Sequence, residues 1–178
     1  MIAADLSLQF PIMKIRKPVH AVVLCCVLMA AAGSEPPLVA DRVVIVKSSR
    51  TMTLLHSGTV VKTYKVALGG HPIGPKERQG DERTPEGEYK IDSRNAHSQF
   101  HLALHVSYPN ASDRERARRL GVDPGGDIMI HGLPRDWSWL GAAHRQHDWT
   151  LGCIAVTNQE IEEIWQLVPV GTPVEIKP

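Results

Sequence analysis

Short runs of alternating apolar and polar residues recur along the chain and predict strands with one buried face. The runs cover residues 42–47, 51–55, 60–68, 88–93, 100–107, 128–130 and 173–177. Residues 100–107 show the pattern most clearly: Leu102 and Leu104 share one face, whereas His101 and His105 share the other. The chain is therefore expected to consist mainly of strands.

Two segments have the period of an amphipathic helix instead. Residues 112–120 end at Gly121, a residue that favours helix termination. The second helix is expected to begin at Thr157 or Asn158 and to end before Pro169. Its apolar stripe consists of Ile161, Ile164, Trp165 and Val168. The predicted fold class is mainly β with two short helices.

Two long segments have no apolar period. Residues 69–85 are rich in glycine, proline and charge, and residues 137–149 contain Trp137, Trp139 and Trp149. Long loops in small domains are usually functional or disordered. We therefore expect both segments to border a substrate groove.

The N-terminal segment has the pattern of a secretory signal peptide. Lys14 and Lys17 precede an apolar run over residues 19–32, which ends in small residues. This run is shorter than the roughly 20 residues that a membrane-spanning helix needs. We expect residues 1–33 to be a signal peptide cleaved near Ala32, and the protein to be exported to the periplasm. An uncleaved N-terminal anchor is the alternative.

The remaining boundaries follow from composition. Residues 1–12 lie ahead of the basic segment, so a translation start at Met13 is a hypothesis. Residues 34–40 contain two adjacent prolines and are expected to be a linker. Residues 41–178 have a length that suits one catalytic domain.

Net charge and cysteine content exclude several classes of function and of stabilisation. The net charge is +1, so no overall field would gather nucleic acid or an acidic membrane surface. Cys25 and Cys26 fall in the apolar N-terminal run, which leaves Cys153 as the cysteine of the domain. A disulfide framework within the monomer is excluded. A lone thiol in an exported protein is expected to be buried or used.

Cys153 and His131 form the candidate catalytic pair. Cys153 follows Gly152, whose lack of a side chain lets a substrate backbone approach. A thiol nucleophile needs a neighbouring base, and His131 follows a buried strand that would hold it rigidly. Backbone N–H groups of Gly152 and Cys153 could stabilise an oxyanion, as acyl transfer requires. Ser107, Asp127 and backbone carbonyls are the candidates for orienting His131.

A zinc site is the rival interpretation, with His131, His144, His147 and Cys153 as ligands. The chain has no Cys-x-x-Cys pair, and the residues beside His147 are typical of a surface loop. We therefore expect no metal and no other cofactor.

Three motifs occur in a characteristic order. They are Arg-Thr-Pro-Glu-Gly-Glu-Tyr at residues 83–89, Ile-Met-Ile-His-Gly at 128–132 and Thr-Leu-Gly-Cys-Ile-Ala-Val-Thr-Asn at 150–158. Together, behind a signal peptide, they resemble the signature of the YkuD-type L,D-transpeptidase family. The resemblance covers about residues 41–177.

The resemblance implies a β-sandwich catalytic domain that acts on peptidoglycan stem peptides. Cys153 would attack the carbonyl of an L-centre beside a D-centre and form a thioester, with His131 as general base and Gly152 in the oxyanion site. An amine would then take the acyl group, in an L,D-transpeptidation. This amine would belong to meso-diaminopimelate, a free D-amino acid or the lysine of a wall-linked lipoprotein. The resemblance also implies that carbapenem-type inhibitors acylate Cys153. Substrate-binding roles are assigned to Gly132, Thr150, Arg135, Arg145, Trp149 and Tyr108.

Two departures from the family pattern affect the choice of substrate. Leu151 stands where the family usually has a histidine, and Ala155 stands where many members have an arginine. If that arginine grips a carboxylate, Arg135 or Arg145 would have to do so here. Water as acceptor is the alternative, which would make the protein a hydrolase (amidase) that cleaves lipoprotein or stem peptide from peptidoglycan. A non-catalytic wall-binding module is the second alternative, although a binder would not need the thiol of Cys153.

Overall fold

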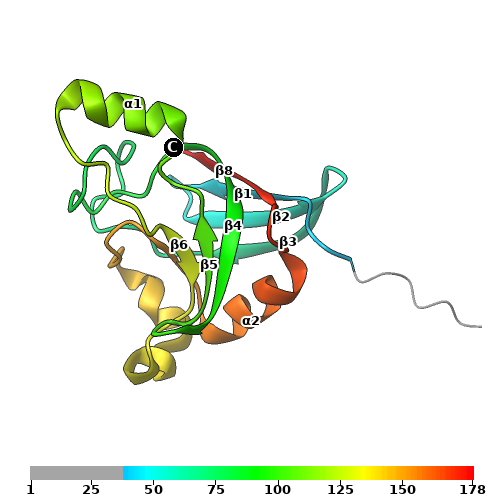
Figure 1. Ribbon diagram of the computed structural model, residues 1–178. Helices are drawn as coiled ribbons and strands as arrows, with labels where there is room; N and C mark the ends of the chain where they lie inside the picture. The colour runs from blue at the N-terminus through cyan, green and yellow to red at the C-terminus, as the bar shows by residue number, and fades with distance from the viewer. Residues whose placement is uncertain (1–37) are drawn as a thin grey trace, which may run out of the picture. The chain divides into compact units, whose positions relative to one another are not determined.

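One sheet of eight strands forms the frame of the computed structural model, which describes residues 38–178 (Figure 1). The strand order is β3-β2-β1-β8-β4-β5-β6-β7. The first half of the sheet contains β3 (Thr59–Lys65), β2 (Thr51–His56), β1 (Arg42–Val46) and β8 (Pro173–Lys177). The second half contains β4 (Gly87–Ser98), β5 (His101–Val106), β6 (Met129–His131) and β7 (Ile154–Ala155). The expected mainly β fold is confirmed.

Strand β4 joins the two halves. Its first residues, from Gly87 to Lys90, pair with β8, and its later residues pair with β5. The register shifts between Ile91 and Ser93, and such irregularities bend a strand. The sheet therefore curls, and both halves contribute to one core. The core includes Ile45, Leu54, Leu104, Ile130 and Ile154, all fully buried.

Strand β8 lies between β1 and β4. It runs parallel to β1, with Val43 opposite Val174, and antiparallel to β4. Val174 and Ile176 are buried against the core, as the alternation over residues 173–177 predicts.

Two α-helices occur where the pattern predicts them. Helix α1 (Ala111–Leu120) begins at Asn110, whose side chain accepts hydrogen bonds from the amides of Ser112 and Asp113. It ends at Gly121, which has the left-handed φ of 66°. Helix α2 (Asn158–Leu167) begins at Thr157, and Thr157 and Glu160 form a capping box.

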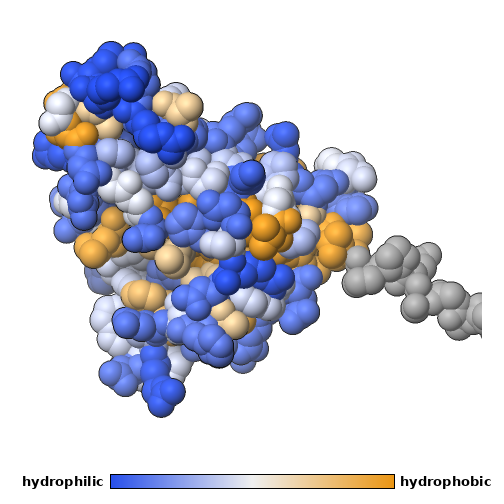
Figure 2. All heavy atoms as spheres, in the orientation of Figure 1, coloured by the Kyte–Doolittle hydropathy of each residue, from blue (hydrophilic) through white to orange (hydrophobic). Residues whose placement is uncertain are grey.

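The outer face of α1 is hydrophilic (Figure 2). Three of its four arginines form ion pairs within the helix: Arg116 with Asp113, and Arg118 and Arg119 with Glu115. This pairing is typical of a solvated helix face.

Two segments differ from the prediction. Residues 135–146 form η1 (Arg135–Gln146), a 3₁₀ segment interrupted at Gly141, rather than a loop without secondary structure. The segment has no 3.6-residue period, because a 3₁₀ helix repeats every three residues. Strand β7 was not expected, since two residues are too few to show alternation.

Other expectations fall outside the structure. The predicted signal peptide and most of the linker lie outside the described residues. Within residues 38–178, no helix combines the length and apolar character needed to cross a membrane.

Candidate active site

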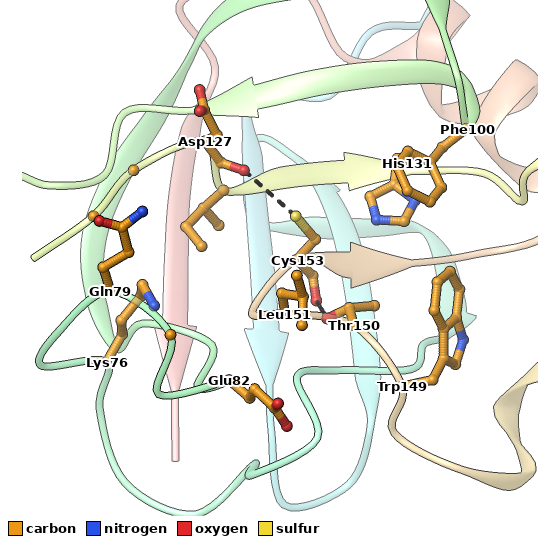
Figure 3. Close-up of a pocket in the computed structure, with 14 residues that line it drawn as sticks. Lys76, Gln79, Glu82, Phe100, Asp127, His131, Trp149, Thr150, Leu151 and Cys153 are labelled. Carbon is orange, nitrogen blue, oxygen red and sulfur yellow. Dashed lines mark hydrogen bonds between the residues drawn. The ribbon is translucent and has the colours of Figure 1, made fainter.

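Cys153 and His131 lie in one cleft of about 490 Å³ (Figure 3). His131 ends β6, and Cys153 comes directly before the neighbouring strand β7. Ile130 pairs with Ile154 across these parallel strands, and both face the core. Because side chains alternate along a strand, His131 and Cys153 point to the opposite face. The strand pairing thus brings together two residues that are distant in sequence.

His131 is held as a neutral base. Its Nδ1 lies 2.7 Å from the Gly132 carbonyl oxygen, and a carbonyl can only accept, so Nδ1 carries the proton. The Nε2 lone pair is therefore free to accept a proton. Burial lowers the pKa of His131 to about 4, against the opposing effect of the Gly132 hydrogen bond. The ring packs against Phe100 and Trp149, with centroid distances of 4.4 and 5.9 Å.

Cys153 rests as a thiol. Its Sγ donates a long hydrogen bond of 3.5 Å to the Asp127 carbonyl oxygen (Figure 3). Burial raises the pKa of the thiol, although a hydrogen bond from the Met129 backbone and, to a smaller extent, the charge of Lys76 act in the opposite direction. Within residues 38–178, no hydrogen bond joins the sulfur to the His131 ring. The pair is thus a neutral thiol beside a neutral imidazole, and proton transfer must accompany attack.

Thr150 shapes the turn before the nucleophile. Its hydroxyl donates to the Cys153 carbonyl at 2.8 Å and accepts from the Gly152 amide at 3.1 Å. Gly152 has a φ of +127°, and a Cβ there would lie 2.6 Å from the Arg83 carbonyl oxygen. The Gly152 amide, which the sequence placed in the oxyanion site, is occupied by its hydrogen bond to Thr150. The Cys153 amide has no acceptor among the residues that the structure describes, so it remains available for a substrate oxygen.

Gly132 and Asn158 fix the loop that follows the base. The Asn158 side-chain oxygen accepts a hydrogen bond of 2.7 Å from the Leu133 amide. A Cβ on Gly132 would lie 2.6 Å from the same oxygen. Only a glycine after His131 leaves room for the Asn158 side chain at the start of α2. This contact fixes the position of the Gly132 carbonyl, which orients the His131 ring.

The sequence left several residues of the cleft unassigned. Phe100 belongs to the strand pattern but faces His131 instead of the core. Lys76, Gln79 and Glu82 come from the loop over residues 69–85, which borders the cleft as expected. The absence of an apolar period was the signal for that loop, but it does not single out individual side chains. Trp149 borders the cleft and contacts Trp137, with ring centroids 5.0 Å apart. Trp139 is 80% exposed.

The zinc interpretation requires a cluster of metal-binding side chains. Within residues 38–178, no three or more His, Cys, Asp or Glu side chains lie close enough together to hold a metal ion. His144 is buried, and its Nδ1 accepts from the Trp149 indole N–H at 3.3 Å.

The family model of the L,D-transpeptidase catalytic domain (YkuD) matches residues 40–176. The chain belongs to this family.

Relatives and solved structures agree with this family. The chain is 32% identical over 130 residues to YafK of Escherichia coli (strain K12), which is named among the L,D-transpeptidases, and the match covers 70% of the chain and 45% of YafK. It is 28% identical to YqjB of Bacillus subtilis (strain 168), named likewise, over 86% of the chain and 83% of YqjB. The crystal structure of the helical cell shape determining protein Pgp2 from Campylobacter jejuni superposes with a TM-score of 0.60 and 25% identity, covering 78% of the chain and 48% of Pgp2. The chain thus spans about half the length of YafK and of Pgp2.

Of the residues assigned to substrate binding, Thr150 and Trp149 line the cleft of this L,D-transpeptidase domain, whereas four others do not. Gly132 lies beneath it against Asn158 and Ile161. Arg135 borders a separate cavity with Asp136, and Arg145 forms an ion pair with Glu160. Tyr108 is buried, and its hydroxyl donates to the Pro124 carbonyl at 3.0 Å. The segment from Arg135 to Gln146 folds into η1, which carries both arginines away from Cys153.

The two departures from the family pattern occupy different environments. Leu151 borders the cleft with 76% of its surface exposed. Ala155 is fully buried in β7 and pairs with His131.

Proposed function

We propose that this domain is a peptidoglycan-modifying cysteine enzyme that performs L,D-transpeptidation. The observation that carries the proposal is the free thiol of Cys153 beside a neutral His131, both facing one cleft from neighbouring strands. A neutral imidazole can take the thiol proton, whereas an imidazolium cannot.

The first half-reaction acylates the enzyme. His131 Nε2 takes the thiol proton as the sulfur attacks the carbonyl carbon of an amide in the stem peptide. The oxyanion that forms accepts a hydrogen bond from the Cys153 amide. His131 then returns the proton to the leaving nitrogen, the C–N bond breaks and a thioester remains on Cys153. The leaving amine must therefore lie on the His131 side of the sulfur.

The second half-reaction releases the acyl group. An acceptor amine attacks the thioester carbonyl and gives its proton to His131. The C–S bond breaks, and the sulfur recovers the proton from His131. The product is a new amide, and the enzyme returns to its starting state.

Hydrolysis is the second candidate, and the departures at Leu151 and Ala155 motivate it. Water in place of the amine gives a carboxylic acid by the same steps and requires no acceptor site. The domain would then cleave stem peptide or lipoprotein from peptidoglycan. A non-catalytic wall-binding module is less well supported, because a binder needs neither a thiol nor an oriented base.

The proposal includes a cellular setting. Its substrate lies outside the cytoplasmic membrane, which agrees with the signal peptide expected over residues 1–33. A wall-linked lipoprotein is a proposed partner, and carbapenems are proposed to acylate Cys153. The similarity to Pgp2, a cell shape determining protein by its title, suggests that activity would affect cell shape.

A muropeptide assay tests the proposal. The purified chain and its Cys153→Ala variant are incubated with sacculi that carry bound lipoprotein, and the products are identified by mass spectrometry. New crosslinks, D-amino-acid exchange or lipoprotein attachment, lost in the variant, are the expected result. Release of lipoprotein or shortening of stems, also lost in the variant, would make the domain a hydrolase. Products that do not depend on Cys153 would contradict both candidates.

A further inference from the structure

A buried histidine outside the catalytic pair lies near the end of η1. His144 is 6% exposed, and its Nδ1 accepts a hydrogen bond of 3.3 Å from the indole N–H of Trp149. An indole N–H only donates, so Nδ1 carries no proton and Nε2 carries the proton of the neutral ring. Trp149 in turn packs in a T-shaped arrangement against His131, with ring centroids 5.9 Å apart. His144 is thus connected to the catalytic base through one side chain.

The histidine is less favourable for stability than an apolar side chain would be at this position. Within residues 38–178, the buried Nε2 of His144 has no hydrogen-bond partner. A buried donor without an acceptor is destabilising. Packing alone would therefore favour a leucine or a phenylalanine here. The polar atom that is used is Nδ1, so the hydrogen bond with Trp149 is what distinguishes His144 from an apolar residue.

Backbone hydrogen bonds fix the chain on both sides of Trp149 but do not orient its ring. The Asp148 carboxylate accepts from the Leu68 amide at 2.9 Å, and the Thr150 amide donates to the Leu68 carbonyl at 3.1 Å. These bonds place the Cα atom of Trp149 and leave its side-chain torsions open. The indole has one polar atom, and that atom is bonded to His144. The His144 contact therefore determines the torsions that put the ring against His131.

The Trp149 ring lies between His131 and the open part of the cleft. His131 is 2% exposed, and its ring also packs against Phe100 at a centroid distance of 4.4 Å. Trp149 is only partly buried and lines the cleft, and Figure 3 shows it on the same side of Cys153 as His131. A Trp149 ring that moved away would let water reach the His131 ring from the cleft.

The groups around His144 leave its ring neutral near pH 7. Arg145 and Glu160 face it and form an ion pair with each other, and His131 is the third titratable neighbour. Burial is the main reason that the pKa of His144 falls to about 4; Arg145 and His131 also lower it, whereas Glu160 raises it. Nδ1 is therefore unprotonated at neutral pH and able to accept from Trp149.

We propose that His144 is a positioning residue for the proposed reaction, which holds the Trp149 ring against His131 and so keeps water away from the catalytic base. The inference rests on the proposed function, which assigns His131 as that base. His144 does not line the cleft, so it acts through Trp149. The titratable groups that face the His131 ring are the Cys153 thiol and His144, and both are neutral near pH 7. Access of water to His131 therefore controls its affinity for a proton.

A titration of the His131 ring by nuclear magnetic resonance tests the inference without catalysis. His144→Leu removes the acceptor and fills its space with an apolar side chain. The midpoint of His131 protonation, about 4 in the wild type, should rise toward the ordinary value of 6.5 by at least about one pH unit, because water then stabilises the charged ring. Trp149→Phe keeps an aromatic ring without the indole N–H and should raise the midpoint likewise. The resonance is assigned by its loss in His131→Gln.

Three comparisons separate positioning from stability. His144→Gln supplies an amide oxygen for the indole N–H and should keep the midpoint near the wild-type value. His97→Leu removes an exposed histidine and should leave the midpoint unchanged. Combining His144→Leu with Trp149→Phe should shift the midpoint no further than either change alone, because both act through one contact. A His131 ring that stays neutral down to about pH 5 in His144→Leu would overturn the proposal, whatever the melting temperature of the variant.

The same variants separate a failure of this inference from a failure of the proposed function. Carbapenem acylation of Cys153 should fall at the pH where the His131 ring becomes protonated, in the wild type and in His144→Leu alike. No acylation of the wild type would contradict the proposed function, and the titration would still decide whether His144 controls the His131 ring. An unchanged titration together with normal acylation would overturn the inference and leave the proposed function in place.

Discussion

At the scale of single residues, the neutral state of His131 decides how the site responds to pH. The ring is buried between Phe100 and Trp149, and burial lowers its pKa to about 4. The His131 ring is therefore uncharged, and able to accept a proton, at every pH near neutrality. Cys153, in contrast, has a raised pKa and needs that base.

The first prediction concerns acylation. The rate of carbapenem acylation at Cys153 should be constant from neutral pH down to about pH 5 and fall as the pH passes about 4, because protonated His131 cannot accept the thiol proton. His131→Ala should lower the rate about 10²- to 10⁴-fold at pH 7. Both are measured by mass spectrometry of the adduct against time. A midpoint near the ordinary histidine value of 6.5 would show that burial does not control the base.

The second prediction concerns Gly152. Gly152→Ala places a Cβ 2.6 Å from the Arg83 carbonyl at a φ of +127°. It should lower the free energy of unfolding by about 2–4 kcal/mol, from backbone strain and overpacking together. Gly126→Ala is the control, because its Cβ would meet nothing within 4 Å. Urea denaturation measures both, and similar values for the two variants would contradict the prediction.

Individual residues differ in how well the sequence reveals them. Cys153 and His131 stand in motifs with distinctive neighbours, so their chemistry can be recognised before the fold is known. Lys76 stands in a loop with other charged residues, and only the fold shows that it is buried at the cleft. Arg135 and Arg145 show the reverse case, because proximity in sequence to the nucleophile does not place a side chain in the cleft.

At the scale of elements, α2 supports the catalytic base through its first residue. Asn158 accepts a hydrogen bond from the Leu133 amide and so fixes the loop that carries the Gly132 carbonyl. The helix itself is held by the buried residues Ile161 and Ile164. An element outside the cleft thus sets the orientation of the His131 ring.

The third prediction tests this link. Asn158→Ala should cost about 1–2 kcal/mol of folding stability, because the buried Leu133 amide loses its acceptor. It should also slow acylation of Cys153, since the His131 ring loses a fixed partner. Gln159→Ala, at the next and exposed position of α2, is the matched control. Thermal unfolding and adduct formation are measured in parallel, and an unchanged acylation rate would limit Asn158 to a structural role.

Elements with a strong period were predictable, and short irregular ones were not. Residues 112–120 have the apolar spacing of a helix and residues 173–177 have that of a strand, and the structure places a helix and a strand there. The N-cap of α1 is Asn110, which lies before the periodic segment. Its role as the cap depends on the hydrogen bonds that its side chain accepts, and these are visible only in the structure. β7 has only two residues, and its place is set by pairing with β6.

At the scale of the whole molecule, buried histidines make stability depend on pH. His131 and His144 both have a pKa of about 4, mainly because burial disfavours their charged form. The unfolded chain binds more protons than the folded chain between the unfolded value of 6.5 and about 4. The stabilising contribution is therefore fully present above pH 6.5 and is lost as the pH falls toward 4.

The fourth prediction follows from this linkage. The free energy of unfolding, measured by urea titration, should decrease steadily from pH 7 to pH 4. His144→Gln should reduce that dependence, because glutamine does not titrate and can still accept from the Trp149 indole. His97→Gln, at an exposed position, is the control and should leave the slope unchanged. Equal slopes in the two variants would exclude His144 as a source of the pH dependence.

The overall architecture was partly visible in the sequence. Alternation identifies the strands, but it does not state which strands are neighbours. The curl arises at β4, where the register shifts beside Ile91, and no residue type marks that bend. The cleft then results from the curled sheet together with the loop over residues 69–85, so its lining could not be derived from local patterns.

The position of β8 has a consequence for the order in which the molecule can assemble. Strand β8 lies between β1 and β4 and pairs with both. Val43 of β1 can therefore pair with Val174 only when residues 173–177 are present. Until then the two halves of the sheet each expose an unpaired edge, and such edges favour aggregation. Closing so long a loop of chain also slows folding. Residues 173–177 must therefore be synthesised before the cleft can form. A polypeptide truncated before Pro173 would expose two aggregation-prone sheet edges and would not fold into a domain that is merely inactive.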